Sequence, residues 1–126
     1  RALTQEPSIL LLDEPTSHLD FGNQVLILDT IGRLTAERGL TVIMATHFPN
    51  HALLMSNRVA LMKDGGFMAV ASPEQAITEE NLRALYGVDV RVVSFDNGAG
   101  AQTRSVIPIL ADHRQDSHSA SKGGIV

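Results

Sequence analysis

Two neighbouring carboxylates, Asp13 and Glu14, directly follow the aliphatic run at residues 9–12. Four consecutive aliphatic residues indicate a strand that is buried on both faces, as in a parallel sheet covered by helices. Open α/β sheets bind their ligands beyond the carboxyl ends of the strands. One carboxylate at such an edge can hold Mg²⁺ through water, and its neighbour can orient or deprotonate a second water. The pair therefore predicts chemistry on a phosphoanhydride bond.

A histidine, His47, is expected at the same edge of the sheet as the two carboxylates. A helix is predicted over residues 22–38, capped by Asp20 and ended by Gly39. The apolar and β-branched residues 41–45 predict a second buried strand. Because a strand–helix–strand unit brings its two strands side by side and parallel, the residues that follow each strand should meet at one edge.

After His47 the sequence predicts short elements rather than another long helix. Each of them is bounded by turn or capping residues. They are a helix beginning at Pro49, strands over residues 58–63 and 67–71, short helices beginning at Pro73 and near residue 79, and paired strands over residues 88–95 and 105–110.

The segments around the predicted site resemble one protein family. The stretch ILLLDEPTSHLD (residues 9–20) resembles the Walker B strand and D-loop of the ATP-binding subunits of ABC transporters, and VIMATHFPNHA (residues 42–52) is similar to their switch-histidine region. The resemblance implies an α/β fold that forms part of a P-loop NTPase (ABC ATPase) domain. Its sheet would be mostly parallel and flanked by helices, with a C-terminal hairpin and helix extension.

This resemblance implies a role for each residue of the predicted site. Asp13 would hold Mg²⁺ through water, Glu14 would orient or activate the water that attacks ATP, and His47 would donate a hydrogen bond toward the γ-phosphate. The residue types alone leave simpler explanations open. Asp13 can equally cap a loop, Glu14 can be a solvated charge, and a lone histidine is more often structural than catalytic.

Ser17, Leu19 and Asp20 would form the D-loop, which in the family runs along the partner subunit, couples the two ATP sites and helps to bind the nucleotide. On the sequence alone these residues are equally a helix-capping turn, and both descriptions can hold at once. His51 lies four residues after His47 and could form an H-x-x-x-H metal pair with it, but no third ligand accompanies the pair.

The composition restricts the possible binding partners and the expected cellular compartment of the protein. The net charge of −4 argues against nucleic acid as the main partner, because phosphate binding requires clustered lysine and arginine. The chain contains no cysteine, which excludes disulfides and fits a cytosolic protein. No apolar run reaches the length of a membrane-spanning helix.

The sequence contains neither a G-x-x-x-x-G-K-[ST] phosphate loop nor an LSGGQ-type signature. We therefore expect the C-terminal half of a nucleotide-binding domain over residues 1–87, a strand extension over residues 88–111 and a disordered tail over residues 112–126. In the family, the phosphate-loop strand lies between the strand ending near His47 and the strand that follows. Without it two strand edges are unpaired. We therefore expect that the isolated chain folds poorly, or that it is a truncated part of a longer protein, and that it is inactive alone.

A third segment narrows the resemblance within the family. Residues 78–88 are similar to the C-terminal helix and strand of subunits that import iron siderophores, haem, cobalamin and related metal chelates. Membership of this group implies ATP and Mg²⁺ as cofactors and a homodimer of two nucleotide-binding subunits. It also implies transmembrane permease subunits, an indirect partnership with a substrate-binding protein, and a peripheral location on the cytoplasmic face of the membrane.

Two alternative functions remain open from the sequence. A soluble ABC-type ATPase of DNA repair or translation shares the Walker B strand and the D-loop, but it would be expected to carry basic patches. A non-catalytic truncated remnant that binds a partner through its open sheet edges is also compatible with the missing phosphate loop.

Overall fold

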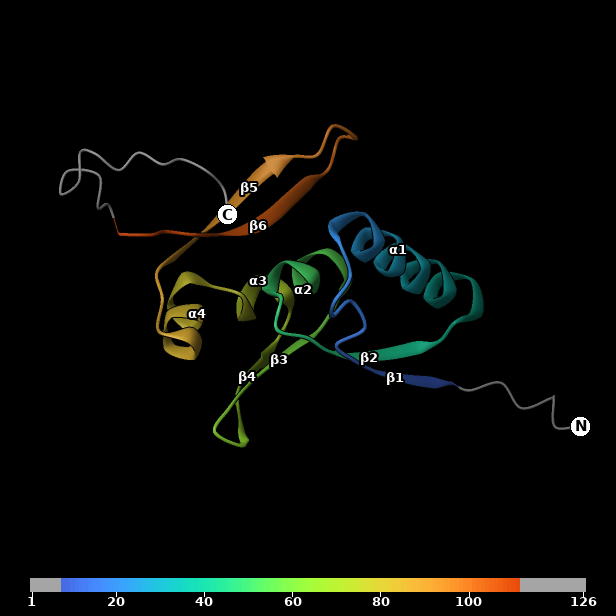
Figure 1. Ribbon diagram of the computed structural model, residues 1–126, viewed down its shortest axis with the longest axis horizontal. Coiled ribbons are helices and arrows are strands. Elements are labelled where there is room, and N and C mark those ends of the chain that lie inside the picture. The colour runs from blue at the N-terminus through green and yellow to red at the C-terminus, as the bar shows by residue number, and fades with distance from the viewer. Residues whose placement is uncertain (1–7, 112–126) are drawn as a thin grey trace, which may run out of the picture.

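The computed structural model describes residues 8–111, so the predicted disordered tail lies outside the described residues (Figure 1). These residues form three two-stranded sheets and four helices. None of the described helices combines the length and the apolar character that crossing a membrane requires. In chain order the elements are β1 (Ile9–Asp13), α1 (Phe21–Arg38), β2 (Thr41–Ala45), α2 (Pro49–Met55), β3 (Val59–Lys63), β4 (Gly66–Ala71), α3 (Pro73–Ala76), α4 (Glu79–Tyr86), β5 (Val90–Asp96) and β6 (Gln102–Pro108).

The strand–helix–strand unit predicted from the sequence is confirmed. β1 and β2 are parallel neighbours, with Ile9 opposite Thr41 at one end and Asp13 opposite Ala45 at the other. The connecting helix α1 begins where the Asp20 carboxylate accepts a hydrogen bond from the backbone N–H of Asn23 at 2.9 Å. It ends at Gly39 in the left-handed conformation (φ 65°), which glycine adopts without steric cost.

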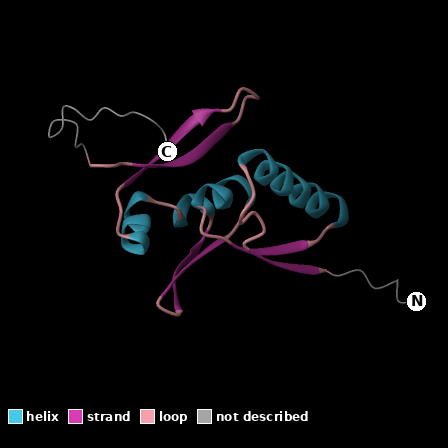
Figure 2. Cartoon of the chain, viewed as in Figure 1, coloured by secondary structure: helices cyan, strands magenta, loops and turns pink. Residues whose placement is uncertain are grey.

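The prediction that β1 is buried on both faces is wrong for the described residues. Ile9 and Leu11 on β1 are 56% and 71% exposed, and Ile43 on β2 is 56% exposed. The helix α1 runs along the pair on one side (Figure 2). Within residues 8–111 no second layer covers the face that carries these three side chains. Aliphatic composition therefore identified the strand, whereas burial depends on layers that the described residues do not supply.

Among the described residues β1 and β2 are the parallel pair, and the other two pairs are antiparallel hairpins, each in a sheet of its own. β3 pairs with β4 through the tight turn at Asp64 and Gly65, and β5 pairs with β6 in continuous register. β2 and β3 belong to separate sheets within the described residues, which agrees with the gap expected between them. The predicted hairpins and short helices are confirmed, with ends displaced by up to three residues.

The hydrophobic core lies in the C-terminal half, where α3 and α4 pack between the two hairpins. Ala76, Ile77 and Leu82 are almost fully buried, at 0%, 1% and 1% exposed. Their cluster also contains residues from β3, β5 and β6, namely Val59, Leu61, Val90 and Val106. The C-terminal elements therefore form one packed unit rather than a loose extension.

Replacing Leu82 with alanine is expected to lower the free energy of unfolding by about 2–5 kcal/mol, because it removes a buried side chain and leaves a cavity. Leu26→Ala is the matched control, since Leu26 is 57% exposed on α1 and its loss should change stability by less than about 0.5 kcal/mol. Urea unfolding followed by circular dichroism measures both values. Equal losses in the two variants would contradict the assignment of this core.

Candidate functional site

The carboxyl ends of β1 and β2 carry the residues that the sequence singles out. Asp13 is the last residue of β1 and lies opposite Ala45, the last residue of β2. The next residue, Glu14, donates its backbone N–H to the Ala45 carbonyl at 2.9 Å. Glu14 is therefore fixed one position beyond the strand, against the end of its neighbour.

The backbone changes direction at Glu14. Its φ of 49° lies in the left-handed region, which costs a non-glycine residue about 1–3 kcal/mol. The Glu14 carbonyl accepts a hydrogen bond from the N–H of Ser17 at 3.1 Å, which closes a turn around Pro15. This turn interrupts the alternation of side chains along the strand, so that Glu14 no longer projects as the next strand residue would. Strained residues of this kind are concentrated at functional sites.

Glu14 and His47 meet at this edge, as the strand–helix–strand argument requires. The Nδ1 atom of His47 and the Oε2 atom of Glu14 form a hydrogen bond. The His47 side chain is 80% exposed and that of Glu14 is 27% exposed. Because Nδ1 is engaged by the carboxylate, the second ring nitrogen of His47, Nε2, is the one left for another partner. The catalytic roles of Glu14 and His47 stay predictions.

Asp13 is exposed, and its carboxylate fits one part of a magnesium donor set. Mg²⁺ at nucleotide sites is usually held by one or two carboxylates together with water and substrate phosphates, rather than by a cage made of protein alone. Among the described residues no three histidine, aspartate or glutamate side chains are grouped so as to hold a metal ion by themselves. The exposed carboxylate of Asp13 has the oxygen donors for one position of such a set.

The turn from Glu14 to Asp20 shows the capping role that the sequence left open. Asp20 caps α1, and the Leu19 N–H donates to the Thr16 carbonyl at 3.2 Å. Thr16 is 1% exposed and anchors the turn, whereas Ser17 is exposed. A capping role does not exclude a D-loop role, and the contacts of Ser17 and Asp20 with a partner subunit stay a prediction.

His51 does not join His47 in a metal pair. It is 8% exposed, and its ring packs against that of Phe48 at a centroid distance of 4.8 Å, whereas His47 is turned to Glu14. Burial lowers the pKa of His51, and the negative charge of Glu14 opposes this shift. Its Nδ1 atom is buried without a hydrogen-bond partner in the described residues.

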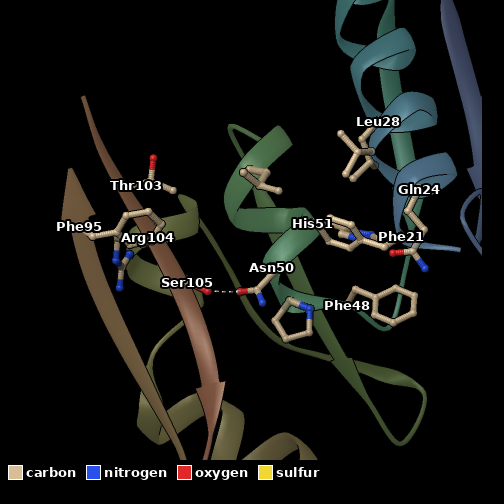
Figure 3. A pocket seen from close by; sticks show the side chains of 13 residues that line it. Phe21, Gln24, Leu28, Phe48, Asn50, His51, Phe95, Thr103, Arg104 and Ser105 are labelled. Atoms are coloured by element: carbon tan, nitrogen blue, oxygen red, sulfur yellow. Dashed lines mark hydrogen bonds between the residues drawn. The ribbon is translucent and has the colours of Figure 1, made fainter. Parts of the chain in front are cut away.

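An open pocket of about 450 Å³ lies beside His51, between α1, α2 and the β5–β6 hairpin (Figure 3). Aromatic rings form much of its lining, and β6 contributes polar side chains. It does not include the carboxylates at the end of β1. The lining residues are Phe21, Gln24, Val25, Leu28, Phe48, Pro49, Asn50, His51, Leu54, Phe95, Thr103, Arg104 and Ser105.

The lowered pKa of His51 predicts a specific loss of stability in acid. The unfolded chain takes up a proton at this residue as the pH falls through about 6.5, while the folded protein resists protonation. The free energy of unfolding should therefore fall as the pH drops below about 6.5 toward the folded-state pKa. Urea unfolding at several pH values measures this slope, which should be smaller in His51→Gln. An unchanged slope in that variant would contradict the buried neutral state of His51.

Two further contacts at the site were missed by reasoning from the sequence. The side chains of Tyr86 and Asn50 tie the segment around His47 to the C-terminal elements. Their partners lie tens of residues away, and no helix or strand periodicity connects such positions. The only sequence signal was that both residues fall in segments similar to ABC subunits.

Comparisons with known proteins identify relatives of this chain. Residues 2–50 match a family profile described as an AAA domain, associated with the AbiEii toxin of a Type IV TA system. The chain is 43% identical over 90 residues to the ABC transporter ATP-binding protein YvrA of Bacillus subtilis, covering 71% of this chain and 20% of that protein. It is 38% identical over 94 residues to the hemin import ATP-binding protein HmuV of Burkholderia pseudomallei, covering 75% and 35% respectively.

A solved structure shares the fold as well. It is described as a metal-chelate type ABC transporter in an inward-facing conformation, and it superposes with a TM-score of 0.74 at 28% identity, covering 82% of this chain and 40% of that chain. The present chain thus spans between 20% and 40% of the length of these relatives. The predicted fold class, part of an ABC ATPase domain, is confirmed. Over about three quarters of its residues, the chain is homologous to ABC-transporter ATP-binding subunits.

Proposed function

We propose that this chain is part of the ATP-hydrolysing subunit of an ABC importer for a metal chelate such as an iron siderophore or haem. The observation that carries the proposal is the contact between Glu14 and His47 at the carboxyl edge of β1 and β2. The hemin import relative and the metal-chelate type transporter support the substrate class.

Each of the three site residues would have a separate role in hydrolysis. Glu14 orients the attacking water and can accept its proton, and its backbone is fixed by the bond to Ala45. His47 is held by Glu14 through Nδ1, which leaves Nε2 to face the γ-phosphate. Asp13 would hold Mg²⁺, which when bound offsets the negative charge of the phosphates.

The proposed partners follow from the family. Two copies of the subunit would enclose two ATP molecules, with Ser17 and Asp20 near the subunit boundary. Loss of the γ-phosphate on hydrolysis would release the contact that holds the dimer closed. The subunit would lie peripherally on the cytoplasmic face of the membrane, bound to transmembrane permease subunits and acting indirectly with a substrate-binding protein.

The test is steady-state ATP hydrolysis by the product of the complete gene, including any coding sequence upstream of Arg1. A second preparation joins residues 1–126 behind the phosphate-loop half of the hemin import relative, which supplies the family motifs that this chain does not contain. Hydrolysis is expected in at least one preparation. Its absence from both, while the intact relative is active under the same conditions, would overturn the proposed function.

A further inference from the structure

The segment that carries His47 is held from the C-terminal half of the fold. It leaves the end of β2, passes through His47 and enters the first turn of α2 at Asn50. Elements distant in the sequence contact it at two points, one on each side of its turn into the helix. The first point is the side chain of Asn50, and the second is the backbone carbonyl of His47.

The Asn50 amide pairs with the backbone of β6 as another strand would. Its Oδ1 atom accepts the Val106 N–H at 2.6 Å, and its Nδ2 atom donates to the Val106 carbonyl at 3.3 Å. The Ser105 hydroxyl donates to the same Oδ1 at 3.4 Å (Figure 3). Because Val106 belongs to the buried core cluster, this pairing joins the start of α2 to the hydrophobic core of the described fold.

Tyr86 forms the second contact. Its hydroxyl donates to the His47 carbonyl at 3.4 Å, from the last residue of α4. Burial raises the pKa of Tyr86, and the charge of Glu14 raises it further, so the hydroxyl keeps the proton that it donates. The helix end is itself fixed, because the Lys63 ammonium donates to the Ala84 carbonyl at 2.6 Å.

We propose that Asn50 and Tyr86 are positioning residues that hold the backbone of His47 so that its ring meets Glu14. On this proposal α4 and β6 brace the switch histidine, and neither side chain touches the reacting atoms. The inference rests on the proposed function, because it assigns a role in ATP hydrolysis. It adds that the position of His47 depends on contacts from the C-terminal elements α4 and β6.

Loss of the two contacts should affect kcat to different extents. The Asn50 pairing has two points and includes a short bond, whereas the Tyr86 bond is long for a hydroxyl donor. Small displacements of a catalytic group can cost up to about 100-fold in rate. We expect Asn50→Ala to lower kcat about 10-fold or more and Tyr86→Phe to lower it less, with the KM for ATP unchanged in both.

The test measures kcat and KM for ATP hydrolysis in the two preparations described above. Asn81→Ala is the matched control, because the Asn81 amide also donates to a backbone carbonyl, that of Ala76 at 2.9 Å, but lies away from His47. Asn50→Asp keeps the acceptor for the Val106 N–H and loses the donor, so its kcat should lie between those of wild type and Asn50→Ala. A merely structural role would instead make Asn50→Ala and Asn81→Ala alike.

A second measurement separates this proposal from the proposed function. Nitrogen-15 NMR of the His47 ring in the same two preparations reports its contact with Glu14 without requiring hydrolysis. Asn50→Ala and Tyr86→Phe should shift these signals in the direction of Glu14→Gln, and Asn81→Ala should not. If these shifts are present but no hydrolysis occurs, the proposed function is refuted and the contacts of Asn50 and Tyr86 with the His47 segment are not. Unchanged His47 signals together with control-like kcat values would overturn the positioning role.

Discussion

Replacing Glu14 with glutamine is expected to lower kcat for ATP hydrolysis about 10²–10⁴-fold while ATP still binds. The amide keeps the size of the side chain but cannot accept a proton from the attacking water. It also replaces the charged partner of the His47 Nδ1 atom with a neutral one. The measurement is steady-state hydrolysis, with nucleotide binding followed separately by equilibrium titration.

A matched control for this variant is Glu74→Gln, because Glu74 is an exposed glutamate in the first turn of α3, away from the β1–β2 edge. Its kcat should equal that of the wild type. Wild-type turnover in Glu14→Gln would contradict the assignment of Glu14 as the residue that activates water. Residues 1–126 alone are expected to show no measurable turnover, and activity there that disappears in Glu14→Gln would overturn this expectation.

The elements around the site could be predicted because their signals are local. Asp20 caps α1 through a residue three positions away, and Gly39 ends it with a backbone conformation that glycine favours. The strands β1 and β2 are each five residues long and consist mostly of apolar residues. The right-handed crossover rule then places both carboxyl ends at one edge. This chain of local rules was sufficient to bring Glu14 and His47 together.

The burial of β1 could not be predicted in the same way, because it depends on what lies across the sheet. Leu11 belongs to an aliphatic run, yet its side chain is 71% exposed. A run of this composition is typical of a strand covered on both faces, but it does not indicate whether the covering layer is present. The hydrophobic core lies elsewhere, since the large apolar side chains that are almost fully buried, Ile77 and Leu82, lie in the C-terminal half.

Backbone conformation and long-range hydrogen bonds were also beyond what the sequence could predict. Glutamate has no special preference for the left-handed conformation found at Glu14, so residue type did not indicate the change of direction there. Asn50 pairs with Val106 across 56 positions, and Tyr86 reaches His47 across 39. Such contacts follow from the packing of the C-terminal elements onto α2, which becomes visible only in the folded structure.

These contacts imply that the predicted strand extension is integrated with the site. Residues 88–111 were predicted to form a C-terminal strand extension, and within this segment β6 holds the first turn of α2 through Asn50. On the positioning proposal, a change in the C-terminal hairpin would be transmitted to the segment that carries His47. The Glu14–His47 contact would then depend on the stability of the core around Leu82 as well as on the residues at the edge.

Removal of Mg²⁺ by a chelator is expected to abolish ATP hydrolysis, and Asp13→Asn should raise the Mg²⁺ concentration needed for half-maximal activity. Asp13 is an exposed carboxylate at the carboxyl end of β1 and would contact the ion through water. Loss of a residue that acts through an outer-shell contact typically costs about 10–100-fold in metal affinity or activity. The size of the shift should fall in this range.

Two measurements separate metal binding from catalysis in this prediction. Binding of ATP is titrated at increasing Mg²⁺ in the wild type and in Asp13→Asn, and hydrolysis is measured over the same concentrations. Asp64→Asn is the matched control, because it changes the same functional group in the β3–β4 turn, where asparagine tolerates the left-handed backbone. A wild-type Mg²⁺ dependence in Asp13→Asn would remove Asp13 from the metal site. The aspartate would then be only the end of a strand, and Glu14 and His47 would carry the chemistry without it.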